Sequence, residues 1–263
     1  MNSKGIDMAS NVLSREFMVK PSECNAAGKL PLTLLVAQMI DVATDHANEL
    51  GIGFLALEPM GAGWVLSRLS VEMVRWPANG ERYKLSTWIE SYNAHYSERC
   101  FSVVTNEGET LGYGRTIWMI IDLSSHKSLG TAGTIMPDEM IAGLPCPIPR
   151  MDRQRAVEFT KETEYEFQYM DIDYYRHVNT VKYIALLLNQ FALKDFDENF
   201  ISRFDIAFAR EAKYGEQAKI KSMKEPVETP ILIGADLPSE KHIFQISTED
   251  RTILNSSFVL SKL

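Results

Sequence analysis

The chain has 263 residues, of which 45% are hydrophobic and 24% are charged, and its formal net charge is −8. This length allows one or two domains with a buried core, and the composition is ordinary for a soluble globular protein. The negative charge argues against nucleic acid or an anionic membrane as the main partner. No apolar run reaches the roughly 18 residues that a membrane-spanning helix needs.

The N-terminal segment and the cysteines favour a cytoplasmic protein without a metal site. Residues 1–14 contain neither the apolar core of a secretory signal nor an Arg-rich transit peptide. The three cysteines are scattered and form no C-x-x-C pair, so we expect neither a disulfide framework nor a zinc site. The sequence has no phosphate loop, dinucleotide fingerprint or G-x-S-x-G elbow, and we expect no cofactor. His95, His126 and His242 stand in polar or turn surroundings and suggest no ligand set.

The first half of the chain predicts one strand, one helix and then a series of strands. A short strand is expected at residues 16–20. Pro31 stands at a favourable helix start, and apolar residues recur at helical spacing through residues 31–50. The period then changes to two, which predicts antiparallel strands at residues 65–73, 83–91, 98–105 and 110–122. This order predicts an antiparallel sheet packed on a helix, an α+β arrangement.

A proline-rich segment follows and separates the two halves. Four prolines between residues 136 and 158 predict a semi-rigid linker rather than a helix or strand. We therefore expect an N-terminal domain at residues 1–135, a linker at 136–158 and a C-terminal domain at 159–263. Three arginines gather at the end of the linker, Arg150, Arg153 and Arg155. They form either a solvated connector, which is the more common arrangement, or a docking patch for an acidic protein.

The second half repeats the order of the first. The sequence predicts a strand at residues 160–168, a loop at 170–177, a helix at 179–194, and strands at 200–210, 217–223, 231–235, 242–248 and 252–261. The repetition concerns architecture and not obvious sequence. The loop ahead of the first helix offers Cys24-Asn25-Ala26-Ala27-Gly28 and no histidine. If the halves are related, only the second has an acid and an imidazole in this loop.

Asp173 and His177 are the candidate catalytic residues of this second loop. They precede Asn179, whose side chain is a good N-cap for the predicted helix. The unpaired amides and the dipole of a helix N-terminus favour developing negative charge. An acid, an imidazole and such a helix end are the parts of a hydrolytic site. Polar residues ahead of a helix nevertheless more often only cap it and orient the loop.

The run His177-Val178-Asn179-x-Val181-Lys182-Tyr183-Ile184, preceded by Asp171-x-Asp173, resembles the signature of the acyl-acyl-carrier-protein thioesterases of bacteria and plastids. The tryptophan motifs at residues 63–68 and 87–88 and the segment at residues 208–212 are also similar to that family, and the resemblance covers nearly the whole chain. It implies a tandem double hotdog fold of the α+β class, in which each half is an antiparallel sheet wrapped around a long central helix.

The resemblance also implies an activity, which is the hydrolysis of acyl-acyl-carrier-protein to free fatty acid and carrier protein in fatty acid biosynthesis. By this resemblance Asp173, His177 and Glu211 take the catalytic positions. The residues expected to bind the substrate are Asn179, Tyr175 and Trp64. The expected partners are a fatty acyl thioester, acyl carrier protein docked at the linker arginines, and a second copy of the chain in a homodimer.

The chain departs from the family pattern at two positions. The family has Asp-x-Asn-x-His, and Tyr175 stands at the asparagine position. Many relatives have a cysteine after the carboxylate, and here that residue is Ala212, which excludes a cysteine nucleophile. Hydrolysis would then proceed through an activated water, with Glu211 as the general base and His177 polarising the carbonyl or the water. The division of roles between Glu211 and Asp173 stays open.

Two other functions are compatible with the sequence. A hotdog dehydratase or hydratase would act on a related thioester by proton transfer and would not need a base that activates water. A non-catalytic protein that binds acyl thioesters is compatible with Tyr175 in place of asparagine.

Overall fold

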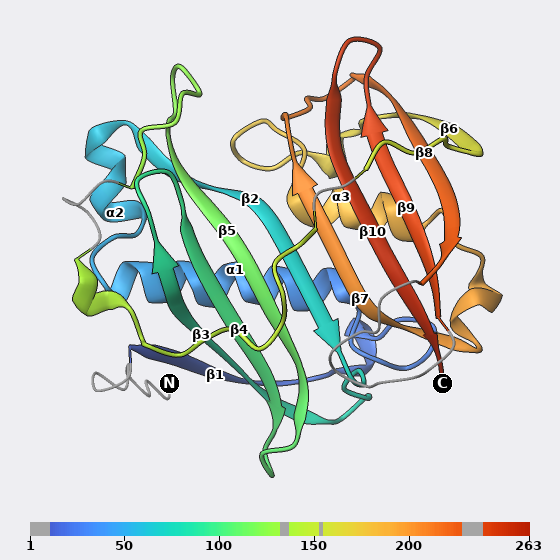
Figure 1. Cartoon of the computed structure of the whole chain (residues 1–263), viewed down its shortest axis with the longest axis horizontal. Helices are drawn as coiled ribbons and strands as arrows, with labels where there is room; N and C mark the ends of the chain where they lie inside the picture. Colours follow the sequence, from blue (N-terminus) through green and yellow to red (C-terminus); the bar gives the residue numbers. More distant parts are fainter. Residues whose placement is uncertain (1–10, 132–136, 153–154, 228–238) are drawn as a thin grey trace.

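The computed structural model describes residues 11–131, 137–152, 155–227 and 239–263. Within these residues, ten strands form one sheet in the order β1-β3-β4-β5-β2-β7-β10-β9-β8-β6, and every neighbouring pair is antiparallel. Figure 1 shows the two main helices, α1 and α3, behind this sheet, one in each half of the molecule. Of the helices in the described residues, none has the length and apolarity to cross a membrane.

The first half follows the predicted order closely. Its elements are β1 (Val12–Met18), α1 (Leu32–Glu49), α2 (Phe54–Leu57), β2 (Ala62–Met73), β3 (Arg82–Tyr92), β4 (Ser97–Thr105) and β5 (Thr110–Asp122). Pro31, at the N-cap of α1, has an extended backbone with ψ of 146°, so the helix begins directly after it. The apolar face of α1, which includes Leu35, Val36 and Met39, is buried in the main core. The predicted helix at residues 31–50 is confirmed.

The second half contains the corresponding elements. These are β6 (Lys161–Glu166), α3 (Thr180–Leu188), β7 (Asn199–Phe208), β8 (Gln217–Pro226), β9 (Ser239–Ser247) and β10 (Thr252–Lys262). The strand predicted at residues 231–235 lies outside the described residues. Each half therefore combines a helix with an antiparallel set of strands, as predicted. The boundaries of the predicted domains stay a prediction, because the sheet is continuous across both halves.

The second helix is shorter than predicted. It ends at Leu188, whereas the sequence predicted a helix to residue 194. The ring of Phe191 lies among aromatic rings of the sheet, 4.6 Å from the ring of His242, 5.5 Å from Phe244 and 5.4 Å from Phe258 between centroids. Phe191 is thus apolar because it packs against the sheet. Its helical spacing from the residues of α3 does not mean that the helix continues.

The two halves are joined by the pairing of β2 with β7, which is reinforced by charged side chains. Arg203 on β7 donates to Glu72 Oε2 of β2 at 2.8 Å and to both carboxylate oxygens of Asp205 at 2.9 and 3.0 Å. Ser70 on β2 donates to Asp205 Oδ1 at 2.6 Å. Glu72 is completely buried, and the side chain of Arg203 is only 13% exposed. These ion pairs lie across the junction between the halves.

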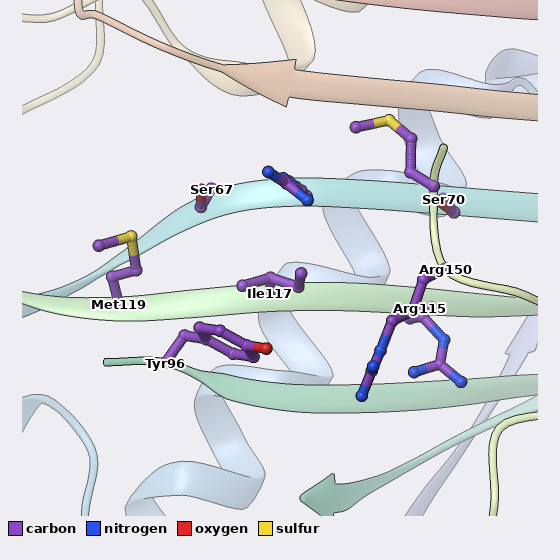
Figure 2. A pocket seen from close by; sticks show the side chains of 9 residues that line it. Ser67, Ser70, Tyr96, Arg115, Ile117, Met119 and Arg150 are labelled. Atoms are coloured by element: carbon purple, nitrogen blue, oxygen red, sulfur yellow. The ribbon is translucent and has the colours of Figure 1, made fainter. Parts of the chain in front are cut away.

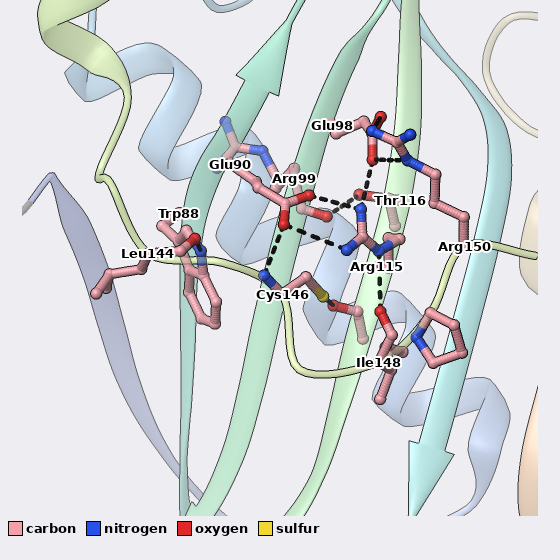
Figure 3. A network of polar contacts seen from close by, with 12 residues as sticks. Trp88, Glu90, Glu98, Arg99, Arg115, Thr116, Leu144, Cys146, Ile148 and Arg150 are labelled. Atoms are coloured by element: carbon pink, nitrogen blue, oxygen red, sulfur yellow. Dashed lines mark hydrogen bonds and ion pairs between the residues drawn. The ribbon is translucent and has the colours of Figure 1, made fainter. Parts of the chain in front are cut away.

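The part of the proline-rich linker at residues 144–150 is fixed to the sheet. Figure 3 shows residues 144–150 crossing β3, β4 and β5. The carbonyl of Leu144 accepts from the Trp88 indole at 2.7 Å, and the amide of Cys146 donates to Glu90 Oε1 at 2.7 Å. Arg150 pairs with Glu98, whose side chain is 1% exposed, at 2.6 Å. Arg115 of β5 also pairs with Glu98, so two arginines neutralise this buried carboxylate.

We predict that Arg203→Met lowers the free energy of unfolding by about 3 kcal/mol, because it leaves the buried carboxylate of Glu72 without its arginine. Urea denaturation followed by circular dichroism measures the change. Arg75→Met is the matched control. Arg75 pairs with Glu81 and Glu109 at the surface, and loss of exposed pairs costs less than about 1 kcal/mol. Equal losses in the two variants would contradict a stabilising role for the junction.

Candidate active site

The loop ahead of α3 is closed by backbone hydrogen bonds and by one carboxylate. Ile172 and Val178 form an isolated antiparallel bridge, and the amide of Asp173 donates to the carbonyl of His177 at 2.8 Å. Oδ1 of Asp173 accepts from the amides of Tyr175 and His177 at 2.9 and 3.2 Å. Asp173 therefore contacts the backbone of its own loop and fixes the position of His177.

The loop ahead of α1 has the same hydrogen bonds. Oδ1 of Asn25 accepts from the amides of Ala27 and Lys29 at 3.1 and 3.0 Å, and the amide of Asn25 donates to the carbonyl of Lys29 at 2.9 Å. Asn25 thus corresponds to Asp173, and Lys29 to His177. Gly28 has φ of +69°, and Arg176, at the equivalent place, has the same value. The loop geometry therefore requires neither the charge of Asp173 nor an imidazole.

Asn179 is the N-cap of α3, as predicted. Its Oδ1 accepts from the amide of Val181 at 2.8 Å. Its own amide donates to the carbonyl of Asp171 at 2.8 Å and is not available to a substrate. In the described part of the chain the amide of Thr180 has no hydrogen-bond partner. Of the amides of Asn179 and Thr180, therefore, only that of Thr180 is free within the described residues.

Glu211 lies in the segment after β7, close to this helix N-terminus. Its Oε2 is 3.3 Å from Nε2 of His177. The next residue, Ala212, is buried and held on both sides: its carbonyl accepts from the amide of Val178 at 2.9 Å, and its amide donates to the hydroxyl of Tyr183 at 3.1 Å. Burial raises the pKa of the Tyr183 hydroxyl, which stays protonated. The loop and α3 thus fix the backbone beside Glu211, and the structure brings Glu211 and His177 together.

His126 also contacts Glu211, and the sequence did not indicate this. Nδ1 of His126 is 3.2 Å from Oε2 of Glu211, and the rings of His126 and His177 are 5.8 Å apart in an edge-to-face arrangement. His126 belongs to the turn after β5, in the other half of the chain. Its sequence neighbours are polar turn residues, so no local pattern could have connected it with Glu211.

The two aromatic residues predicted to bind substrate lie in different surroundings. The ring of Tyr175 is 43% exposed and lies 4.0 Å from that of Tyr174. The indole of Trp64 donates to the carbonyl of Ile52 at 2.8 Å and packs with Ala47 and Ile89. Within the described residues, no hydrogen bond joins either aromatic side chain to His177 or Glu211.

A separate pocket of about 260 Å³ lies over β2 and β5, beside the end of the linker. Figure 2 shows side chains of β2 and β5 and of the linker around it. Its lining residues are Ser67, Arg68, Ser70, Tyr96, Arg115, Ile117, Met119, Arg150 and Met151.

Two further arginines belong to the predicted docking patch. Arg155 pairs with Glu225 at 2.5 Å, and Arg153 lies outside the described residues. Among the described residues there is no group of three or more His, Cys, Asp or Glu that could hold a metal ion.

Comparison with known families gives two matches that together span most of the chain. The model of the acyl-ACP thioesterase N-terminal domain matches residues 10–143, and that of the C-terminal domain matches residues 154–253. The palmitoyl-acyl carrier protein thioesterase of Gossypium hirsutum chloroplasts is 24% identical over 229 residues, which are 81% of this chain and 54% of that protein. The chain spans about half the length of the curated relatives it matches.

Solved structures give the same result for the fold. An acyl-ACP thioesterase from Bacteroides thetaiotaomicron superposes with a TM-score of 0.84 at 24% identity, covering 97% of this chain and all of that one. The 12:0-ACP thioesterase of Umbellularia californica superposes with a TM-score of 0.77 at 18% identity, covering 97% of this chain and 95% of that one. These likenesses confirm the predicted α+β tandem double hotdog fold.

Proposed function

The chain belongs to the acyl-ACP thioesterase family, and we propose that it hydrolyses the thioester of an acyl chain on acyl carrier protein, releasing a free fatty acid. The observation that carries this proposal is the 3.3 Å approach of Glu211 and His177 beside the N-terminus of α3. A carboxylate and an imidazole next to a free helix amide are the groups that hydrolysis of a thioester requires.

In the proposed reaction, Glu211 is the general base. Its carboxylate takes a proton from water while the water oxygen forms a bond to the thioester carbonyl carbon. The tetrahedral intermediate then expels the thiolate, which receives the proton from Glu211. General-base catalysis of this kind contributes about 10²- to 10⁴-fold to the rate. Ala212 supplies no nucleophile, so no covalent acyl-enzyme is formed at that position.

Thr180 and the dipole of α3 are proposed to stabilise the oxyanion of the intermediate. The amide of Thr180 is the free donor at the start of this nine-residue helix. A preorganised donor aimed at a developing oxyanion contributes about 10²- to 10³-fold. His177, fixed by the loop hydrogen bonds, polarises the water or the carbonyl. We propose that the negative charge of Asp173 stabilises the positive charge that develops on His177 in the transition state.

We predict that Glu211→Gln and Asp173→Asn each lower kcat by about 10²-fold, measured as release of free thiol from acyl carrier protein substrates. The asparagine variant should keep the loop folded, because Asn25 makes the same hydrogen bonds in the first half. It therefore tests the charge of Asp173 alone. Glu107→Gln, at the exposed turn between β4 and β5, is the control and should leave kcat unchanged. Near-normal rates in both site variants would refute the assignment, and a dehydratase or a non-catalytic acyl-binding protein would then have to be tested.

Tyr175 is predicted to take no part in the reaction through its hydroxyl. Its ring is partly exposed and rests against Tyr174, and it makes no hydrogen bond to Glu211 or His177 within the described residues. Tyr175→Phe should therefore change kcat/KM by less than about threefold, which corresponds to less than about 1 kcal/mol. A loss of about a hundredfold in a folded variant would show that the hydroxyl participates. Tyr175→Asn would then test whether the amide typical of the family fits this site.

Docking of the acidic carrier protein is proposed at the basic end of the linker, which contains Arg150, Arg153 and Arg155. Arg150 is the least suitable of these for a test, because it neutralises the buried carboxylate of Glu98.

We predict that the double variant Arg153→Glu and Arg155→Glu raises KM for carrier-bound substrate about fivefold and leaves KM for coenzyme A thioesters unchanged. The difference should shrink at high salt, which screens exposed charges. Lys20→Glu, on the exposed segment after β1, is the control. A KM that ignores both charge reversal and salt would exclude this docking patch.

A further inference from the structure

We infer that His126 is a positioning residue for Glu211, supplied to the active site by the opposite half of the chain. The inference rests on the proposed function, in which Glu211 is the general base. It concerns a residue that lies outside the signature of the site and 85 positions before Glu211 in the printed sequence.

The contacts of Glu211 place its carboxylate between two imidazoles. Nδ1 of His126 lies 3.2 Å and Nε2 of His177 lies 3.3 Å from the same oxygen, Oε2. The two rings meet edge to face at 5.8 Å, so together they border the carboxylate on two sides. Because both imidazoles make their closest approach to Oε2, the other oxygen is the one left to accept the proton of water.

The turn that carries His126 is built from a dense set of hydrogen bonds. Oδ1 of Asp122 accepts from the amides of Ser124 and Ser125 at 3.1 and 2.7 Å and from their hydroxyls at 2.7 and 2.8 Å. These donors lower the pKa of Asp122 to about 2. The backbone of the turn is closed by the amide of His126, which donates to the carbonyl of Asp122 at 2.9 Å. These hydrogen bonds fix the backbone of the turn from which the His126 side chain reaches Glu211.

The backbone of His126 itself is in an uncommon conformation. Its φ is +56°, in the left-handed region that few residues other than glycine adopt, although asparagine, aspartate and histidine adopt it more often than the rest. Such conformations persist where the surrounding structure imposes them, and they are frequent at functional sites. Here the conformation accompanies the direct contact between His126 and Glu211. The backbone conformation of His126 and its contact with Glu211 are therefore both consistent with a positioning role.

Positioning matters for Glu211 because its side chain is 41% exposed and long enough to adopt several rotamers. With only His177 beside it, the carboxylate could rotate toward solvent. A second imidazole in contact with Oε2 restricts the side chain to the orientation in which the other carboxylate oxygen can accept a proton from water. An effect of this kind appears in kcat, since it concerns a proton transfer in the transition state and not substrate binding.

The test uses two replacements of nearly equal size at His126, both tolerated at positive φ. His126→Asn keeps an N–H donor close to the position of Nδ1, and we expect kcat within about threefold of the unmodified chain. His126→Asp places a carboxylate beside Glu211, and we expect kcat about tenfold lower with KM changed by less than about twofold. Thermal unfolding confirms that both variants are folded. His95→Asp, in the exposed turn before β4, is the control for a new negative charge and should not alter the rate.

The same replacement in the Glu211→Gln background shows whether His126 acts through Glu211. If it does, His126→Asp has no further effect there, because no carboxylate is left to be repelled or oriented. The inference is overturned if His126→Asp leaves kcat unchanged, if His126→Asn is equally impaired, or if the aspartate effect persists in the Glu211→Gln background. A normal rate in Glu211→Gln alone would instead refute the proposed function.

Discussion

The pairing of β2 with β7 is the constraint on which the arrangement of the candidate active site depends. β5 and β7 lie on opposite sides of β2, and both are antiparallel to it. They therefore run in the same direction, toward the edge of the sheet at which β2 begins, and β5 extends further along β2 than β7 does. The strands of a sheet are about 4.8 Å apart, so Ile117 of β5 and Ala207 of β7, which both pair with Arg68 of β2, lie roughly 10 Å from each other. This spacing allows His126 and Glu211, which come from different halves, to meet.

The buried charges at this junction have a different role from those of the active site. Arg203 is surrounded by the carboxylates of Glu72 and Asp205 and is largely excluded from water, so its pairs fix the register of two strands. Glu211 and its imidazoles are partly exposed. A catalytic carboxylate must exchange protons with water and substrate, and a completely buried ion pair would hold it in one state. The chain thus has its buried ion pairs in the sheet and its proposed catalytic groups at the edge.

Periodicity in the sequence predicted the helices and most strands, because each of these elements buries one face and the spacing of apolar residues records that burial. The predicted end of the second helix was wrong, because an apolar residue can be buried without being helical. Phe191 continues the helical spacing of α3, but it lies beyond the end of the helix and packs on the sheet beside His242. The loop signature located His177, since that information is local. His126 could not be found in this way, because its contact with Glu211 is created by strand order, which no local pattern contains.

The loops ahead of α1 and α3 show how one loop geometry can carry different side chains in the two halves. Asn25 and Asp173 accept the same pair of backbone hydrogen bonds, so the fold requires an acceptor at this position and does not require a charge. The position equivalent to His177 is Lys29, so the imidazole is dispensable for the loop as well. Residues that the fold does not need are free to serve chemistry, which is the role proposed for Asp173 and His177 beside Glu211. The first half has no such pair in its loop, and its contribution to this site comes from the turn after β5.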